Sequence, residues 1–284
     1  AMQAAAGSSE LREDTVAFRL IAAPGYTELY DEMVTLNADR DETAFIIVDA
    51  PFRLNATEAV AWKQGTTATE NGEDGLVTSN TYSAVYYPHA LTTNPSTGDN
   101  VVAPASHIAL YTYAYSDNVS FQWFAPAGLN RGGIVGAVSV LNRLTHSERD
   151  TLYEGKVNPI AQFPGEGIVA FGQKTLLQNQ SALDRINVRR LLINIRRKVK
   201  AVANTLLFEP NRASTLERFS SLVEPIMSEV QARQGVERYK VQIDTSTTTQ
   251  NDVENNTIRG KIYLQPTKSV EFISLDFVVT NSID

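Results

Sequence analysis

The chain has 284 residues, a formal net charge of −7 and 43% hydrophobic residues, which suits one large or two medium globular domains. It contains no cysteine, which excludes disulfides, cysteine nucleophiles and thiolate zinc sites. No apolar run approaches the roughly 20 residues of a membrane-spanning helix, and the acidic balance argues against a surface that binds nucleic acid throughout.

The first half of the chain alternates predicted strands and helices. The opening residues, AMQAAAGSSE, have neither the basic segment nor the apolar core of a secretory signal. Because Ala1 is not an initiator residue, we expect part of a longer protein in which residues 1–12 are mostly linker. A strand is then predicted over Thr15–Ala23, a helix through TELYDEMVTL and a buried strand over Thr43–Ala50.

Further elements follow up to residue 165. Asn55 or Thr57 is predicted to cap a helix that runs through Trp62, and the polar, glycine-rich residues 65–80 indicate a loop. SAVYYPHA indicates a short strand, and ASHIALYTYAYSDN has helical spacing. The alternation predicts an α/β domain over residues 13–165, with a largely parallel sheet flanked by helices.

The second half, residues 166–284, is predicted to be an α+β domain of two helices followed by strands. Ser181 and Asp184 match a capping box, and an amphipathic helix extends to about Leu207. A second helix follows FEPN, and Pro225 is expected to kink or interrupt it. Strands are predicted in YKVQID, TIRGKIYLQP and VEFISLDFVV, with an exposed loop in TSTTTQNDVENN, and these strands could extend the first sheet.

Catalytic chemistry has little support in the sequence. His89, His107 and His146 lie in unrelated contexts, and we interpret each as structural or surface-exposed. Asp49 ends a predicted buried strand, where open α/β sheets place their ligands, so it is the best candidate for a catalytic carboxylate. We prefer the interpretation that Asp49 caps a loop ahead of Pro51. The alternative is an α/β hydrolase-like enzyme of unknown substrate, which needs a serine, a histidine and an acid in one pocket.

Motifs for cofactors and metals do not match either. The glycines of GLNRGGIVGA lack the lysine and the hydroxyl residue of a phosphate-binding loop. The acidic stretch Glu70–Gly75 lacks the regular oxygen-ligand spacing and the closing glutamate of a calcium loop. We therefore predict no catalytic, cofactor or metal site.

One segment, RINVRRLLINIRRKVK, concentrates positive charge in this acidic chain. Four cations fall on one helical face at spacings of four and seven residues: Arg185, Arg189, Arg196 and Lys200. A charged face is commonly a solvated ridge paired with neighbouring acids. Among binding partners, an acidic protein fits better than nucleic acid or a membrane, because no aromatic side chains lie between the basic ones.

Four stretches carry a set of landmarks in a fixed order. They are DNVSFQWFAPAGLNRGGIVGA, VNPIAQFPGEGIVAFGQKTL, INVRRLLINIRRKVKAVANTLLFEPN and VQIDTSTTTQNDVENNTIRGKIYLQPTKSVEFISLDFVV, and they cover most of the chain after about Tyr113. The landmarks include Ala-Pro-Ala-Gly, Gly-x-Gly-Ile, Asn-Val-Arg-Arg and Phe-Glu-Pro-Asn. Together they resemble the sheath proteins of contractile bacteriophage tails, a family that includes the sheaths of phage-tail-like bacteriocins and injection systems.

The resemblance implies a structural protein of a virion and not an enzyme. Such subunits stack as hexameric rings into a helical sleeve around a tail tube, and the sleeve contracts to drive the tube through the host cell envelope for genome delivery. The implied partners are further copies of the chain, the tail tube protein, and baseplate and tail terminator proteins, without nucleic acid, membrane or cofactor. The implied location is the contractile tail of the virion, after assembly in the host bacterial cytoplasm.

The resemblance also suggests roles for particular residues. We expect the basic helical face to meet the acidic outside of the tail tube or an adjacent subunit. Subunits of the family exchange extended arms, which suggests a strand-exchange region at Phe272, Ser274, Asp276 and Val278. An isolated chain without its upstream arm is expected to be monomeric. A structural corner that closes the core where the two halves meet is expected at Trp123, Phe124, Pro126 and Gly128.

Overall fold

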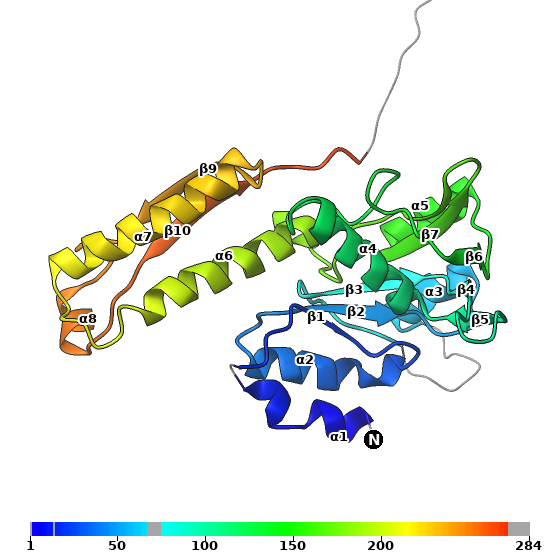
Figure 1. The fold of residues 1–284 in the computed structure, drawn as a ribbon, viewed down its shortest axis with the longest axis horizontal. Coiled ribbons are helices and arrows are strands. Elements are labelled where there is room, and N and C mark those ends of the chain that lie inside the picture. The colour runs from blue at the N-terminus through cyan, green and yellow to red at the C-terminus, as the bar shows by residue number, and fades with distance from the viewer. Residues whose placement is uncertain (1, 14, 67–74, 272–284) are drawn as a thin grey trace, which may run out of the picture.

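The computed structural model describes residues 2–13, 15–66 and 75–271. Figure 1 shows an α/β body from which an elongated arm extends, with helix α6 running from one to the other. We call residues 2–184 the body and residues 186–266 the arm. The fold class predicted from the sequence, a largely parallel sheet flanked by helices and followed by two helices and strands, is confirmed.

Most of the elements belong to the body. Its helices are α1 Met2–Ala6, α2 Tyr30–Asp39, α3 Ala56–Gln64, α4 Ala105–Val119 and α5 His146–Glu154, with the 3-10 turns η1 Glu10–Arg12, η2 Thr27–Leu29 and η3 Ala182–Asp184. Its strands are β1 Leu20–Ala22, β2 Phe45–Asp49, β3 Ser83–Tyr87, β4 Ala90–Thr93, β5 Asn100–Ala103, β6 Ala137–Val140, β7 Val157–Phe163 and β8 Gly167–Ala170. The arm contains α6 Ile186–Asn204, α7 Ala213–Ala232, β9 Val236–Gln242, α8 Gln250–Glu254 and β10 Lys261–Pro266.

The central sheet of the body has the strand order β1-β2-β3-β7-β8. Strands β1, β2, β3 and β7 run parallel to one another, and β8 is antiparallel to β7. Every residue of β2 and β3 is buried, as expected for central strands of a parallel sheet that is covered on both faces. This double burial explains why the β2 sequence FIIVD is a continuous apolar run without alternation.

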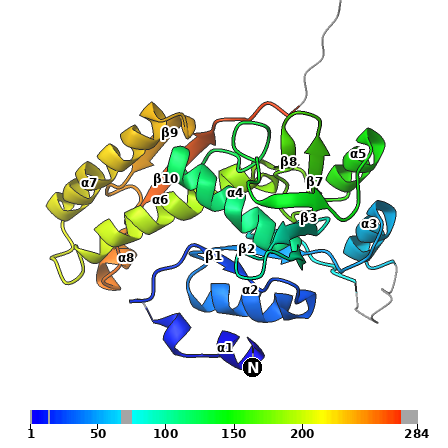
Figure 2. The ribbon, with the colours of Figure 1, turned by 45° about the vertical axis from the view of Figure 1, so that its right-hand side comes forward.

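Two hydrophobic clusters lie on the two faces of this sheet. Because neighbouring side chains of a strand point to opposite faces, Ile46 and Val48 pack with α2, α3 and α5, whereas Phe45 and Ile47 pack with α4 and the start of α6. Figure 2 shows α2 and α4 on opposite sides of the sheet. Ile193 of α6 belongs to the second cluster, so the first part of the arm is anchored on the sheet.

The predicted strand in SAVYYPHA is two strands in the structure. Strand β3 ends at Tyr87, and β4 begins at Ala90 in a separate antiparallel sheet of order β5-β4-β6. Pro88 lies between them and has no N–H group to continue the ladder. The chain therefore leaves the central sheet after β3.

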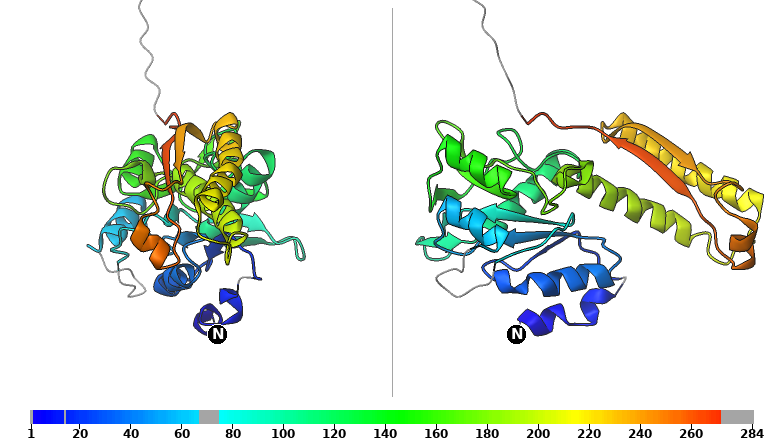
Figure 3. Two further views of the ribbon diagram at one scale, coloured as in Figure 1. Left: turned by 90° about the vertical axis from the view of Figure 1, so that its left-hand side faces the viewer. Right: turned by 180° about the vertical axis from the view of Figure 1, so that it is seen from behind.

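The arm is built on two long helices. Helix α6 has 19 residues and so spans roughly 28 Å, and α7 and the antiparallel hairpin of β9 and β10 pack with its second half in a third hydrophobic cluster. Figure 3 shows the hairpin lying along α7. The expectation that the closing strands extend the first sheet is wrong for β9 and β10, which form a sheet of their own. The third predicted strand, VEFISLDFVV, lies almost wholly outside the described residues.

Other expectations are corrected locally. Helix α7 continues through Pro225 without interruption, because buried side chains on both sides of the proline, such as Leu216 and Met227, hold it in the third cluster. The predicted loop TSTTTQNDVENN contains α8, which Thr249 begins with a capping box. The first predicted strand shortens to β1, and residues 2–12, expected as linker, include α1 and η1.

Candidate assembly interface

A buried ion pair joins the body to the arm. Arg190 of α6 donates from Nη2 to both carboxylate oxygens of Asp117 in α4, at 2.8 and 2.6 Å. The guanidinium also lies 4.8 Å from the centroid of the Tyr113 ring, and 4% of the Arg190 side chain is exposed. Because hydrogen bonds between charged groups are short and directional, this pair fixes the direction in which α6 leaves the body.

Trp123 packs a loop of the body against the arm. Its indole N–H donates to the carbonyl oxygen of Arg233, 3.0 Å away beyond the end of α7. Its ring stacks on Phe121 with centroids 5.0 Å apart, and Trp123 belongs to the third cluster together with Leu191 and Val230. Trp123 therefore connects a loop that precedes α6 in the chain to residues of α6 and to the end of α7.

The glycine loop after Trp123 covers an edge of the central sheet. The N–H of Gly128 donates to the Ala170 carbonyl at 2.9 Å, and the N–H of Ala170 donates to the Gly132 carbonyl at 2.8 Å. A Cβ on Gly132 would lie 2.4 Å from the Ala170 oxygen, so this close approach requires glycine. The edge of β8 is thus occupied by the chain itself and is closed to an added strand at these residues.

The first two cations of the predicted basic face are engaged within the chain. Arg185 forms ion pairs with Asp184 and Glu271, at 2.8 and 2.5 Å. Arg189 is buried, and its guanidinium lies 4.1 Å from the centroid of the Tyr82 ring. Burial lowers the pKa of the Arg189 side chain. These two residues therefore hold α6 in place on the body.

The last two cations pair with an acidic turn that follows α2. Arg196 lies 3.3 Å from the Glu42 carboxylate, and Lys200 pairs with Asp41. The hydrogen bond from Lys200, more than its charge, lowers the pKa of Asp41. The Arg196 and Lys200 side chains remain 52% and 49% exposed, so each can still contact a partner.

The hairpin of the arm presents backbone edges. Among the described residues, β9 and β10 pair with each other and with no further strand. An edge strand offers N–H and C=O groups to which another chain can add a strand. The residues predicted for strand exchange, Phe272, Ser274, Asp276 and Val278, lie outside the described residues.

Asp49 has a structural role, but it caps helix α4 and not the loop ahead of Pro51. Its carboxylate accepts hydrogen bonds from the N–H groups of Ser106, in the first turn of α4, and of Gly25. The Ser106 hydroxyl also donates to Asp49, at 2.9 Å, and burial lowers the pKa of the neighbouring His89. A serine, an acid and a histidine thus lie close together, but the serine proton points at the acid and not at a histidine base.

The other histidines lie at the surface. His107 is exposed on α4, and His146 of α5 lies 2.9 Å from Asp150 with both side chains largely solvated. Among the described residues, no group of three or more His, Asp and Glu side chains is suited to hold a metal ion. The described helices include none that is both long and apolar enough to span a membrane.

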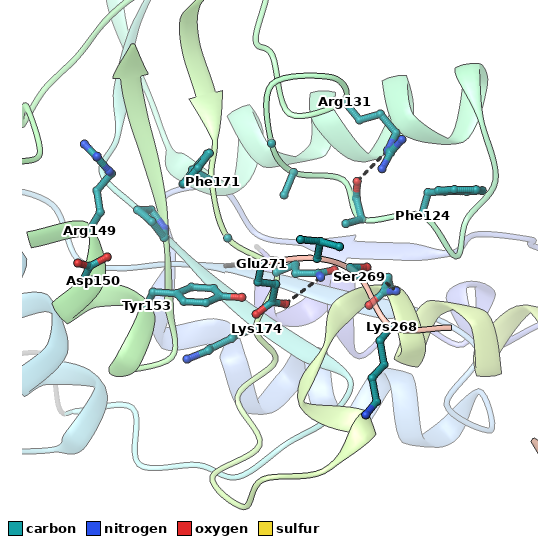
Figure 4. Close-up of a pocket in the computed structure, with 18 of the residues that line it drawn as sticks. Phe124, Arg131, Arg149, Asp150, Tyr153, Phe171, Lys174, Lys268, Ser269 and Glu271 are labelled. Atoms are coloured by element: carbon teal, nitrogen blue, oxygen red, sulfur yellow. Dashed lines mark hydrogen bonds between the residues drawn. The ribbon is translucent and has the colours of Figure 1, made fainter. Parts of the chain in front are cut away.

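A pocket of about 840 Å³ lies where the body meets residues 267–271. Figure 4 shows Tyr153 from α5, Phe171 beyond β8 and Phe124 around it. Its charged lining residues are Arg131, Arg149, Lys174, Lys268, Asp150, Glu154 and Glu271, and His146 also lines it. Burial, together with the charge of Lys156, lowers the pKa of Lys174. No local pattern in the sequence indicates this pocket, because its walls come from segments that are distant along the chain.

Comparison with known proteins gives consistent matches along the chain. The sequence profile of the phage tail sheath protein central domain matches residues 2–176, and that of the phage tail sheath C-terminal domain matches residues 178–280. The tail sheath protein of Vibrio phage KVP40 is 34% identical over 224 residues, which are 78% of this chain and 33% of that protein. The tail sheath protein of Enterobacteria phage T4 is 30% identical over 234 residues, 82% of this chain and 35% of that protein. The chain thus spans about a third of the length of these relatives.

Solved structures show the same fold. A chain of the anti-feeding prophage baseplate in the contracted state has a TM-score of 0.78 at 24% identity, covering 97% of this chain and 76% of that one. The PVC sheath complex of an extracellular contractile injection system, also contracted, gives 0.74 at 26% identity, covering 93% and 71%. Fold and matches together define a component of contractile tail machines. Within that class, the chain belongs to the phage tail sheath protein family, which confirms the resemblance inferred from sequence.

Proposed function

We propose that the chain is part of a structural subunit of a contractile tail sheath. Hexameric rings of the subunit stack into a helical sleeve around a tail tube, and contraction of the sleeve drives the tube through the host cell envelope for genome delivery. The observation that carries this proposal is the match of two sheath profiles to consecutive segments, residues 2–176 and 178–280. The likeness to a sheath complex in the contracted state supports it.

The partners and location follow from the same proposal. The subunit contacts further copies of itself and the tail tube protein along the sleeve, and baseplate and tail terminator proteins at its two ends. It assembles in the host bacterial cytoplasm and acts in the tail of the virion. We propose no catalytic step, because the work of contraction comes from exchanging one set of subunit contacts for another.

Electron microscopy tests the proposal. The full-length subunit is expressed alone and with its tail tube protein, and both samples are imaged in negative stain. Regular sleeves or stacked rings are expected with the tube. Uniform globules under every condition would contradict the sheath function.

Strand exchange is the proposed link between neighbouring subunits. A strand that includes Phe272, Ser274, Asp276 and Val278 of one copy pairs with a hairpin edge of β9 or β10 in the next. Backbone hydrogen bonds supply such a link, so Ser274→Pro, which removes an N–H donor, is expected to reduce sleeve formation strongly. Ser274→Ala is the matched control that keeps the donor. Equal numbers of sleeves from both variants would refute this link.

The exposed end of the basic face is the proposed contact with the tail tube or an adjacent subunit. Arg196→Glu with Lys200→Glu is expected to prevent sleeve formation while the subunit stays folded. The charge swap Lys200→Glu with Asp41→Lys distinguishes a contact with a partner from the ion pair between Lys200 and Asp41, because the swap keeps an ion pair inside the chain. If the swap restores full assembly, Lys200 acts only within the chain and the proposed contact is wrong.

A further inference from the structure

The turn between α6 and α7 exposes an aromatic side chain at the end of the arm. Phe208 is fully exposed, and its neighbour Leu207 is largely exposed. The backbone of Phe208 has a φ of 69°, a left-handed conformation that bulky side chains rarely adopt. Solvation of a phenyl ring on a strained turn gives the folded monomer no benefit, which is typical of a residue that contacts a partner.

The pocket at the other end of α6 has walls that suit an apolar side chain. Phe124, Tyr153, Phe171 and Val270 line it, and Figure 4 labels the first three among its lining residues. Phe171 and Val270 are exposed in the single chain. Aromatic pairs gain from edge and offset contacts in addition to the burial of area, so a phenyl ring is a favourable occupant.

The charges beside Phe208 and those beside the pocket are complementary. Glu209 follows Phe208 directly, and within the described residues it forms no ion pair. Arg131 and Lys268 line the pocket and also have no acidic partner in the described part of the chain. The pocket lining carries four cations and three carboxylates. Its small excess of positive charge and the exposed carboxylate beside the ring favour an encounter in one orientation.

Phe208 and the pocket cannot meet within one chain. Asn187, in the first turn of α6, lines the pocket, whereas Phe208 follows the last turn of the same helix. The 19 residues of α6 separate the two by roughly 28 Å. Figure 1 shows the turn between α6 and α7 at the far end of the arm from the body.

We propose that the turn Leu207–Glu209 of one copy inserts Phe208 into this pocket of a second copy. The inference rests on the proposed sheath function and names one contact of the assembly. A knob and a hole at opposite ends of a rigid helix form a heterologous contact, which repeats from copy to copy and builds a ring or an open helical filament instead of a two-fold dimer.

Cross-linking between copies tests the contact, since the chain has no cysteine of its own. Leu207→Cys and Val270→Cys chains, which keep Phe208 and the aromatic walls of the pocket, are mixed under mild oxidation, and the linked pair is identified by peptide mapping. The matched control mixes Leu207→Cys with Val77→Cys, which replaces an exposed residue of the body away from the pocket lining. Linkage to position 270 is expected on the order of tenfold faster than to position 77, because the contact raises the effective concentration. Equal rates overturn the proposal.

A second variant separates this contact from folding and from the sheath function as a whole. Phe208→Gly suits the left-handed backbone, so the thermal midpoint of the chain is expected to stay the same or rise while sleeve formation by the full-length subunit falls. Normal sleeves from Phe208→Gly would overturn the contact and leave the sheath function standing. Absence of sleeves from the unmodified subunit would overturn the sheath function itself.

Discussion

The ion pair of Arg190 with Asp117 is predicted to be the strongest polar link between the body and the arm. Arg190→Leu removes the cation and leaves the Asp117 carboxylate facing the Tyr113 ring and α6. Since the Arg190 and Asp117 side chains are only 4% and 25% exposed, we treat the pair as buried. Breaking a buried pair costs about 3–5 kcal/mol, and the partial solvation of Asp117 places the expected loss near the lower value.

A double-mutant cycle measures this link. The free energy of unfolding is obtained from urea titrations followed by circular dichroism, for both single variants and for Arg190→Leu with Asp117→Leu. The double variant is expected to recover part of the loss, because apolar replacement of a whole buried pair is often close to neutral. A coupling energy of about 2 kcal/mol is within the range measured for contacting residues.

The small free-energy contribution of exposed ion pairs sets the result that would refute this prediction. Exposed ion pairs contribute about 0–1 kcal/mol. If Arg190→Leu costs less than about 1 kcal/mol and the two substitutions are additive, the pair does not hold α6 to the body. The direction of the arm would then depend on apolar packing, with Ile193 and Trp123 as the main contacts, and on the other ion pairs of α6.

Three further predictions concern stability. Trp123→Ala removes a buried ring and its hydrogen bond, so calorimetry or urea unfolding should show a loss of about 3–5 kcal/mol; a loss below about 1 kcal/mol would show that the corner does not pack in solution. Gly132→Ala, whose Cβ meets the Ala170 oxygen, should lower the free energy of unfolding by about 1–3 kcal/mol. Gly133→Ala, with open space around it, should be nearly neutral. Similar thermal midpoints for both variants would contradict the close approach of Gly132 to Ala170. Hydrogen bonds from the Thr249 hydroxyl and backbone N–H, more than the Arg259 charge, lower the pKa of Asp252 to about 2. Because the folded pKa lies below the unfolded value of about 3.9, this stabilisation is present above about pH 4 and is lost as the pH falls towards 2. The difference in urea midpoint between the native chain and Asp252→Asn should therefore shrink over that window, and a constant difference would contradict the assignment.

Local patterns predicted much of the fold correctly. The run around Ile46 and Ile47 indicated a buried strand, because a strand in a parallel sheet that is covered on both faces needs apolar residues at consecutive positions. The apolar period of α6 and α7 predicted both long helices of the arm, since each buries one stripe. Errors arose where tertiary packing acts against a local signal, as at Pro225 inside α7.

The membership of the sheath family, the α/β body and the two-helix arm were determined by the sequence itself, because periodicity and ordered landmarks are written along the chain. Which charges are free was decided only by the tertiary structure. Arg185 pairs with Glu271 and Lys200 pairs with Asp41, which lie 86 and 159 residues away in sequence, and no local pattern predicts such a pairing. The pocket and the Phe208 turn likewise depend on the length and direction of α6, which place the two at opposite ends of one rigid element.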